Sequence, residues 1–262
     1  MNKISIIMGA YNEEASIARA IESVIKQTCL CWEFIIVDDC STDKTRNIIS
    51  KYCALDPRIK LYKNKKNFGL AYSLNLAINK SSGVYIARMD ADDISLPNRF
   101  EEQLKILDSN NKVMVVGTAA YYVDSDNLKK RLVRMPQYHR DLLSLIFKKS
   151  PFIHPSVMMR EEYLKITSGY DSRLRRAQDY DLWLRGRFIG EYYNIQEPLI
   201  IYGYHNKKMF TGFIKSVQIR LKNSSSAMDF LKSIYWSIYE VMYISLILLT
   251  KVFRVKKSES LI

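Results

Sequence analysis

The chain has 262 residues, of which 48% are hydrophobic and 26% charged, a composition that excludes a disordered or collagen-like protein. Its length suits one α/β domain with an appendage. The 40 Lys and Arg residues exceed the 27 Asp and Glu residues by 13, and this excess indicates a polyanionic partner such as nucleic acid, a phosphate-rich substrate or an anionic membrane.

The first 120 residues alternate short apolar runs with stretches of helical spacing. Strands are predicted at residues 3–8, 33–38, 58–63, 84–89 and 113–117. Helices are predicted between them at residues 14–27, 41–54, 69–79 and 97–107, the second capped by Ser41 or Thr42 and the last opened by Pro97. This alternation predicts an α/β fold with a Rossmann-like, mostly parallel sheet flanked by helices. Ligands of such sheets bind beyond the carboxyl ends of the strands.

Polar residues follow the predicted strands at the ends where ligands would bind. They are Tyr11, Asn12 and Glu13 after the first strand, Asp38 and Asp39 after the second, and Asp90, Asp92 and Asp93 after the fourth. Three carboxylates within four residues repel one another unless a cation lies among them, and Mg²⁺ or Mn²⁺ also binds phosphate oxygens. The acidic motif therefore predicts a metal site for a nucleotide diphosphate. A solvated acidic turn before the next helix is the plain alternative.

Three further groups could take part in chemistry. The Asp38-Asp39 pair could accept the imide N–H of a uracil ring or a ribose hydroxyl, or it could simply face the positive end of a helix. Asp179 lies at the start of a predicted helix, where it could accept a proton from an attacking hydroxyl or serve only the helix dipole. His154 and His205 could each reach a cleft, and His205 could complete a metal shell.

The last part of the chain differs in character from the rest. Residues 234–249 form a run of 16 that is interrupted only by Ser237, Glu240 and Ser245, and four cations follow between residues 251 and 257. The run is shorter than the roughly 20 residues that span a bilayer. It predicts an amphipathic helix that lies in the plane of an anionic membrane. Because Glu13 and Glu14 follow the first apolar run too closely for a signal peptide, we expect a cytoplasmic protein on the inner face of the membrane.

Five segments together resemble the family 2 glycosyltransferases, which have the GT-A fold. In family order they are residues 5–14 (SIIMGAYNEE), 36–43 (IVDDCSTD), 67–71 (NFGLA), 90–93 (DADD) and 179–183 (DYDLW). The resemblance extends over about residues 1–205. It implies a GT-A catalytic domain at residues 1–205 and leaves residues 206–262 as a basic, helical C-terminal appendage that could associate with a membrane.

The resemblance implies an inverting enzyme that moves one sugar from a nucleotide diphosphate donor, first of all a UDP-sugar, to an acceptor hydroxyl. The acceptor would be a glycan or a lipid-linked glycan in bacterial surface polysaccharide synthesis, and no nucleic acid would be bound. By the same likeness, the nucleotide is held by Tyr11, Glu13, Asp39 and Asp90, the last at the ribose or the metal shell. Asp92 would ligate Mn²⁺ or Mg²⁺, and Asp179 matches the general base of the family.

The sequence departs from the family pattern at two positions. Gln178 stands where an acid usually precedes the base, and Gly203 replaces the arginine of the family's Y-R-x-H pattern, which weakens the case for His205 as a metal ligand. The Q-x-x-R-W motif of processive synthases is absent, so addition of a single sugar is favoured.

Two other classes of protein stay open. A sugar-1-phosphate nucleotidylyltransferase would need a glycine-rich loop where residues 9–13 read GAYNE. A non-enzymatic anion- or nucleic-acid-binding protein would need aromatic residues interleaved with cations, whereas the predicted cleft here is acidic.

Overall fold

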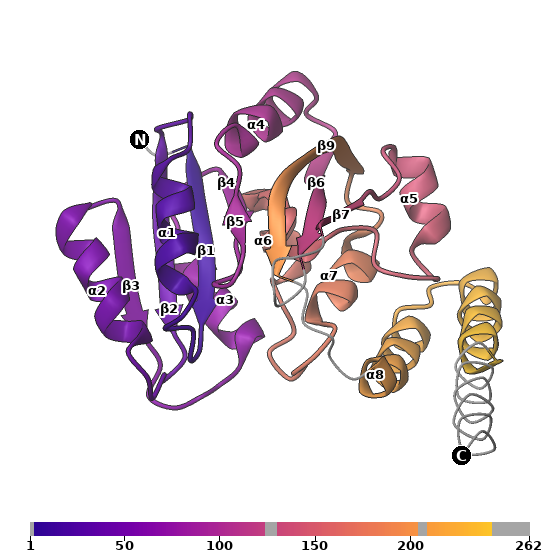
Figure 1. Ribbon diagram of the computed structural model, residues 1–262. Coiled ribbons are helices and arrows are strands. Elements are labelled where there is room, and N and C mark those ends of the chain that lie inside the picture. The colour runs from indigo at the N-terminus through magenta and orange to yellow at the C-terminus, as the bar shows by residue number, and fades with distance from the viewer. Residues whose placement is uncertain (1–2, 124–129, 204–208, 243–262) are drawn as a thin grey trace, which may run out of the picture.

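The structure is a computed structural model that describes residues 3–123, 130–203 and 209–242. Nine strands in these ranges form one sheet in the order β3-β2-β1-β4-β8-β6-β9-β5, with β7 paired to β6 (Figure 1). Helices cover the sheet, and the α/β fold class predicted from the sequence is confirmed.

The N-terminal half alternates strands and helices as predicted. Its elements are β1 (Ile4–Ala10), α1 (Ile17–Ile25), β2 (Trp32–Asp38), α2 (Thr45–Leu55), β3 (Ile59–Lys63), α3 (Leu70–Asn79) and β4 (Tyr85–Arg88). β1 pairs in parallel with β2 and β4, and β2 pairs in parallel with β3. Successive side chains of β1 enter two different cores: Ile6 packs with α1, and Ile7 packs with α3. Burial on both faces explains why the strands read as continuous apolar runs.

The second half extends the sheet past the parallel strands. Its elements are β5 (Ile94–Ser95), α4 (Arg99–Ser109), β6 (Val113–Val123), β7 (Lys130–Val133), α5 (His139–Leu145), a 3₁₀ turn (His154–Ser156), β8 (Met158–Arg160), α6 (Glu161–Thr167), α7 (Gln178–Gly186), β9 (Glu191–Gly203) and α8 (Met209–Lys222). β8 runs antiparallel between β4 and β6 and so joins the two halves. β9 pairs in parallel with β6, and it ends at Gly203, whose N–H donates to Asp93 Oδ1 at 3.0 Å. The end of β9 thus reaches the acidic motif.

The expected capping of α2 by Ser41 or Thr42 is wrong. α2 begins at Thr45, and the residue before it, Lys44, makes no side-chain cap. Instead, the Asn12 N–H donates to Ser41 Oγ at 3.1 Å, and the Thr42 N–H donates to Asn12 Oδ1 at 2.9 Å. These residues therefore join the loops that follow β1 and β2, because hydroxyl and amide groups at strand ends compete for local backbone partners.

α8 packs beside α7, and the helix after it packs against α8, at the end of the molecule farthest from β3 (Figure 1). After α8, residues 227–242 form a further helix within the described part of the chain. No helix of the described residues is both long and apolar enough to cross a membrane. Residues 243–249 of the predicted in-plane helix, and the cations after them, lie outside the described residues. The in-plane helix and the domain boundary at residue 205 stay predictions.

Candidate active site

The edge of the sheet where the parallel strands end holds a cavity of about 270 Å³. Its lining includes Tyr11 and Glu13 from the loop after β1, Asp90 and Asp92 from the loop after β4, and Gly203 at the end of β9. The structure thus brings four of the predicted site residues together in one place. Tyr11, which is 45% exposed, lines this cavity, and its aromatic side chain suits a flat ligand ring.

The acidic motif fits a divalent cation. Each of Asp90, Asp92 and Asp93 offers a carboxylate oxygen, and these oxygens lie within 4.8 Å of one another. Asp93 is buried, and its Oδ2 has no hydrogen-bond partner among the described residues. Burial, together with the charges of Asp90 and Asp92, holds the pKa of Asp93 well above its usual value. Crowded carboxylates with an unpartnered buried oxygen are a set of ligands that suits a divalent cation.

An arginine that the sequence analysis did not single out lies beneath this motif. Arg88, the last residue of β4, is 1% exposed and forms an ion pair with Asp90. Its Nε and Nη1 have no hydrogen-bond partner among the described residues. Burial opposes its charge, yet Asp90 raises the pKa of Arg88 above its ordinary value. The signal was available, since a charged residue that ends a buried strand needs a partner nearby.

A larger cleft of about 680 Å³ adjoins the first cavity and shares Leu70, Asp90 and Tyr202 with it. Asp179, in the first turn of α7, lines this cleft. Burial raises the pKa of Asp179, while the Tyr180 N–H and the charge of Arg88 act in the opposite direction. A raised proton affinity in a cleft is what a carboxylate base requires.

Asp39 is buried, and its carboxylate accepts hydrogen bonds from Asn64 Nδ2 at 2.7 Å and from the N–H groups of Phe68 and Gly69 at 2.9 and 2.7 Å. It holds the loop before α3 and lines neither cavity, so its contact with a nucleobase stays a prediction. His205 lies outside the described residues, and its role as a metal ligand also stays a prediction.

His154 does line the larger cleft. Its Nε2 lies 2.9 Å from the hydroxyl of Tyr170. Burial, and after it the charge of Arg88, holds the pKa of His154 well below the usual value. The ring is therefore neutral near pH 7, and it acts as a hydrogen-bonding wall of the cleft rather than as a cation.

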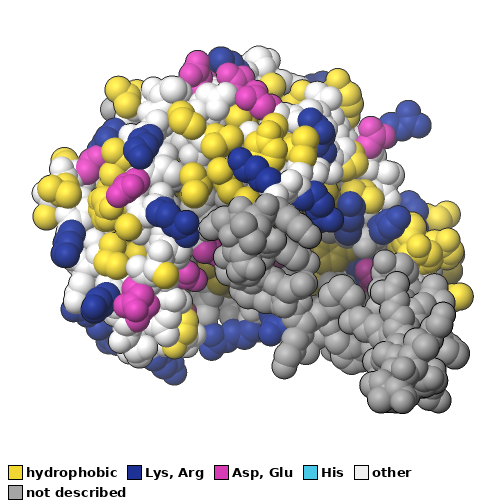
Figure 2. Space-filling view, in the orientation of Figure 1, with side chains coloured by type: hydrophobic (Ala, Val, Ile, Leu, Met, Phe, Trp, Pro, Cys, Tyr) yellow, Lys and Arg dark blue, Asp and Glu magenta, His cyan; other side chains and the backbone are white. Residues whose placement is uncertain are grey.

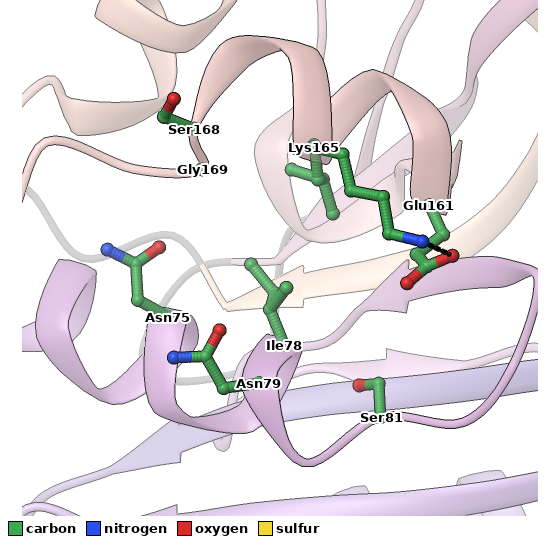
Figure 3. Close-up of a pocket in the computed structure, with 9 residues that line it drawn as sticks. Asn75, Ile78, Asn79, Ser81, Glu161, Lys165, Ser168 and Gly169 are labelled. Carbon is green, nitrogen blue, oxygen red and sulfur yellow. Dashed lines mark hydrogen bonds and ion pairs between the residues drawn. The ribbon is translucent and has the colours of Figure 1, made fainter.

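The loop that leads to Asp179 is fixed to α3 by one side chain. Asn75 Nδ2 donates to the Tyr170 carbonyl at 2.7 Å, and the Tyr170 N–H donates to Asn75 Oδ1 at 2.9 Å. Figure 3 shows Asn75 beside Gly169, at one end of a separate cavity of about 500 Å³ between α3 and α6. The ion pair between Glu161 and Lys165, at 2.7 Å, lies at the other end. None of the acids of the sheet edge lines that cavity, which simply separates α3 from α6.

Comparison with known proteins agrees with this geometry. Residues 5–166 match Glycosyl transferase family 2, and the chain therefore belongs to that family. It is 41% identical over 203 residues to EpsE of Bacillus subtilis, named as a glycosyltransferase, covering 75% of this chain and 71% of EpsE. It is 31% identical over 215 residues to the O-antigen biosynthesis glycosyltransferase WbnJ of Escherichia coli, covering 79% of this chain and 82% of WbnJ. The protein is a glycosyltransferase with relatives in polysaccharide biosynthesis, which sets aside the nucleotidylyltransferase and the non-enzymatic binding protein.

A shorter match and two solved structures add detail. Over 114 residues, covering 44% of each chain, the sequence is 40% identical to the UDP-Glc:α-D-GlcNAc-diphosphoundecaprenol β-1,3-glucosyltransferase WfgD of E. coli. The fold is similar to S. aureus TarS in complex with UDP-GlcNAc, with TM-score 0.68, 19% identity and coverage of 85% of this chain and 65% of TarS. It is also similar to the Pyrobaculum calidifontis mannosyltransferase PcManGT in complex with GDP-Man and Mn²⁺, with TM-score 0.62, 16% identity and coverage of 97% and 82%. These neighbours are GT-A enzymes, as the sequence predicted.

Proposed function

We propose that this protein transfers one sugar from a UDP-sugar to a hydroxyl of a glycan or lipid-linked acceptor, with inversion, in bacterial surface polysaccharide synthesis. The observation that carries the proposal is the shared wall of the two cavities: Asp90 lines both the acidic cavity and the cleft that contains Asp179. A donor diphosphate in the first cavity would place its sugar beside the base. UDP-GlcNAc in TarS and the UDP-glucose named for WfgD support the choice of nucleotide.

Each residue has a separate task in this proposal. Asp179 takes the proton of the acceptor hydroxyl while its oxygen attacks the anomeric carbon, and the nucleoside diphosphate departs from the opposite side. One displacement inverts the configuration at that carbon. Asp92, with Asp90, would hold Mn²⁺ or Mg²⁺, which supplies positive charge to the departing diphosphate. Arg88 keeps Asp90 in place from below.

We also propose that the protein lies on the anionic inner surface of the cell membrane through the helix of residues 227–242. One face of this helix is apolar: Met228, Leu231, Tyr235, Ile238 and Met242 are between 56% and 67% exposed. The opposite face is turned inward, where Asp229 binds Arg187 at 2.9 Å, Ser233 is buried and Trp236 packs against the core. Figure 2 shows hydrophobic side chains gathered over this helix. A helix with its apolar face outward suits a lipid surface.

The central test combines the purified protein with Mn²⁺ and a panel of UDP-, GDP- and dTDP-sugars. The expected donor raises the melting temperature and is slowly hydrolysed. Transfer to an acceptor should give a product whose anomeric configuration, measured by NMR coupling, is opposite to that of the donor. A product with the donor's configuration would refute the single displacement, and selective binding of a GDP- or dTDP-sugar would refute the choice of nucleotide.

A further inference from the structure

Three residues line both the acidic cavity and the cleft that contains Asp179, and two of them have hydrophobic side chains. These two are Leu70, at the start of α3, and Tyr202, near the end of β9, while the third is Asp90. In the proposed function, the donor diphosphate lies among the acids and the acceptor hydroxyl lies at Asp179. The sugar that is transferred must therefore lie where the two cavities meet, beside Leu70 and Tyr202.

The ring of Tyr202 is held in place by contacts on its own strand and on the next. Tyr202 lies opposite Tyr122 in the parallel pair of β9 and β6, and the two ring centroids are 4.8 Å apart, with the ring planes at 43°. The following residue, Gly203, donates its N–H to Asp93 Oδ1 at 3.0 Å. A Cβ at Gly203 would lie 3.3 Å from the Asp92 carbonyl oxygen, so glycine lets the strand end approach the acidic motif closely.

The side chain of Tyr202 offers its ring, rather than a charge, to the two cavities. Tyr202 is half-buried, and its hydroxyl makes no hydrogen bond with any residue that the structure describes. Burial, and after it the charges of Asp90 and Asp93, raises the pKa of Tyr202, so the phenol stays neutral. The face of an aromatic ring carries partial negative charge and attracts groups with partial positive charge. The C–H groups on the face of a pyranose ring are such groups.

We propose that Tyr202 binds the transferred sugar of the donor, with its aromatic ring packed against the C–H groups on one face of the pyranose. Leu70 adds a second apolar contact at the same place. This inference rests on the proposed function, and it adds the residue that recognises the sugar of the donor as distinct from its nucleotide. The fold itself does not require the hydroxyl of Tyr202, and so phenylalanine should serve equally well.

The test measures the Kd of UDP, UDP-glucose and UDP-N-acetylglucosamine for the full chain in the presence of Mn²⁺. Tyr202→Leu keeps an apolar side chain against Tyr122 but removes the ring. It should raise the Kd of the UDP-sugar that the wild type binds by roughly 3- to 10-fold and leave the Kd of UDP unchanged. Tyr202→Phe keeps the ring and should match the wild type.

Tyr121→Leu is the matched control. Tyr121 lies on β6 beside Tyr122, is half-buried, and has Lys130 Nζ 4.6 Å from its ring centroid. It lines neither of the two cavities, so its replacement should leave all three Kd values unchanged. A second measurement on the wild type avoids any loss of stability in a variant. The C–H protons of the bound sugar should shift upfield in the NMR spectrum, because they lie over an aromatic ring.

Several results would overturn the assignment of Tyr202. Wild-type affinity of Tyr202→Leu for the UDP-sugar, an equal loss in Tyr202→Phe, or no upfield shift of the sugar protons would each show that the ring does not bind the sugar. An equal rise in the Kd of UDP and of the UDP-sugar would show that Tyr202 supports the nucleotide or metal site instead. A wild-type protein that binds neither UDP nor a UDP-sugar would refute the proposed function itself, which the results on Tyr202 do not.

Discussion

Two aspartates on α7, two residues apart, should respond to substitution in opposite ways. Asp179 lines the cleft, whereas Asp181 is fully buried and accepts hydrogen bonds from Arg185 at 2.7 Å, Lys222 at 3.3 Å and Asn223 at 3.2 Å. The first is placed for chemistry, and the second joins α7 to α8. Spacing and composition do not separate them, because both belong to one short acidic segment, and it was the family resemblance that pointed to Asp179.

Asp181→Ala should lower stability. Loss of one partner of a buried ion pair costs about 3–5 kcal/mol, and the lower value applies because the partners Arg185 and Lys222 are 24% and 49% exposed. At roughly 2–4 °C per kcal/mol for a chain of this size, about 3 kcal/mol lowers the melting temperature by roughly 6–12 °C. Donor turnover by the protein that remains folded should change little.

Asp179→Asn should instead lower kcat by roughly 10² to 10⁴ at saturating donor, with an unchanged Kd for UDP. Its melting temperature should hold or rise, because burial raises the pKa of Asp179 in the folded chain above its unfolded value. Above that pKa the ionised carboxylate opposes folding, and the amide removes this cost. In the wild-type protein, activity should fall as the pH drops through the raised pKa, which lies above the ordinary 3.8.

Scanning fluorimetry and a transfer assay on both variants decide the matter. The assignment of the base is refuted if Asp179→Asn keeps its rate, or if it loses stability and UDP affinity together. It is equally refuted if Asp181→Ala melts normally and yet loses the reaction.

Three further outcomes are expected. Asp92→Ala should abolish transfer and the Mn²⁺ dependence of UDP binding, and full wild-type activity in EDTA would contradict this. Burial would raise the pKa of Glu33, but hydrogen bonds, including one from Lys60, outweigh it and lower that pKa from 4.5 to about 2. The free energy of unfolding should therefore fall by about 3 kcal/mol as the pH drops from 5 to 2. The Glu33→Gln variant should not show this loss. Leu231→Asp should reduce flotation with phosphatidylglycerol vesicles roughly tenfold or more, while Leu55→Asp, at another exposed leucine, should not.

The strands of the parallel half could be predicted to within a few residues because each is an apolar run bounded by polar residues. The predicted strand 113–117 was too short, since β6 extends to Val123. Its second half pairs with β9, from Ala119 opposite Pro198 to Val123 opposite Gly203. That partner lies some 80 residues away, and the periodicity of one segment gives no information about such pairing.

The candidate site was predictable where it depends on strand ends and not where it depends on tertiary contacts. Asp90 and Asp92 could be placed because parallel strands end at one edge of a sheet. The arginine beneath them, Arg88, could be recognised only from the ion pair that it forms with Asp90. Asp39 illustrates the same limit, since its hydrogen-bond partners Asn64, Phe68 and Gly69 come from a loop 25 to 30 residues further along.

The C-terminal helices are part of the structure that supports the base, and this decides how membrane binding can be tested. Removing residues 227–242 would take away Asp229 and Glu240, the partners of the buried Arg187 and Arg220. Unpaired buried guanidinium groups beside α7 would destabilise the helix that carries Asp179. A truncated protein could therefore lose activity without any membrane being involved. A change on the outward face, such as Leu231→Asp, touches none of these contacts, and so it separates membrane binding from the integrity of the site.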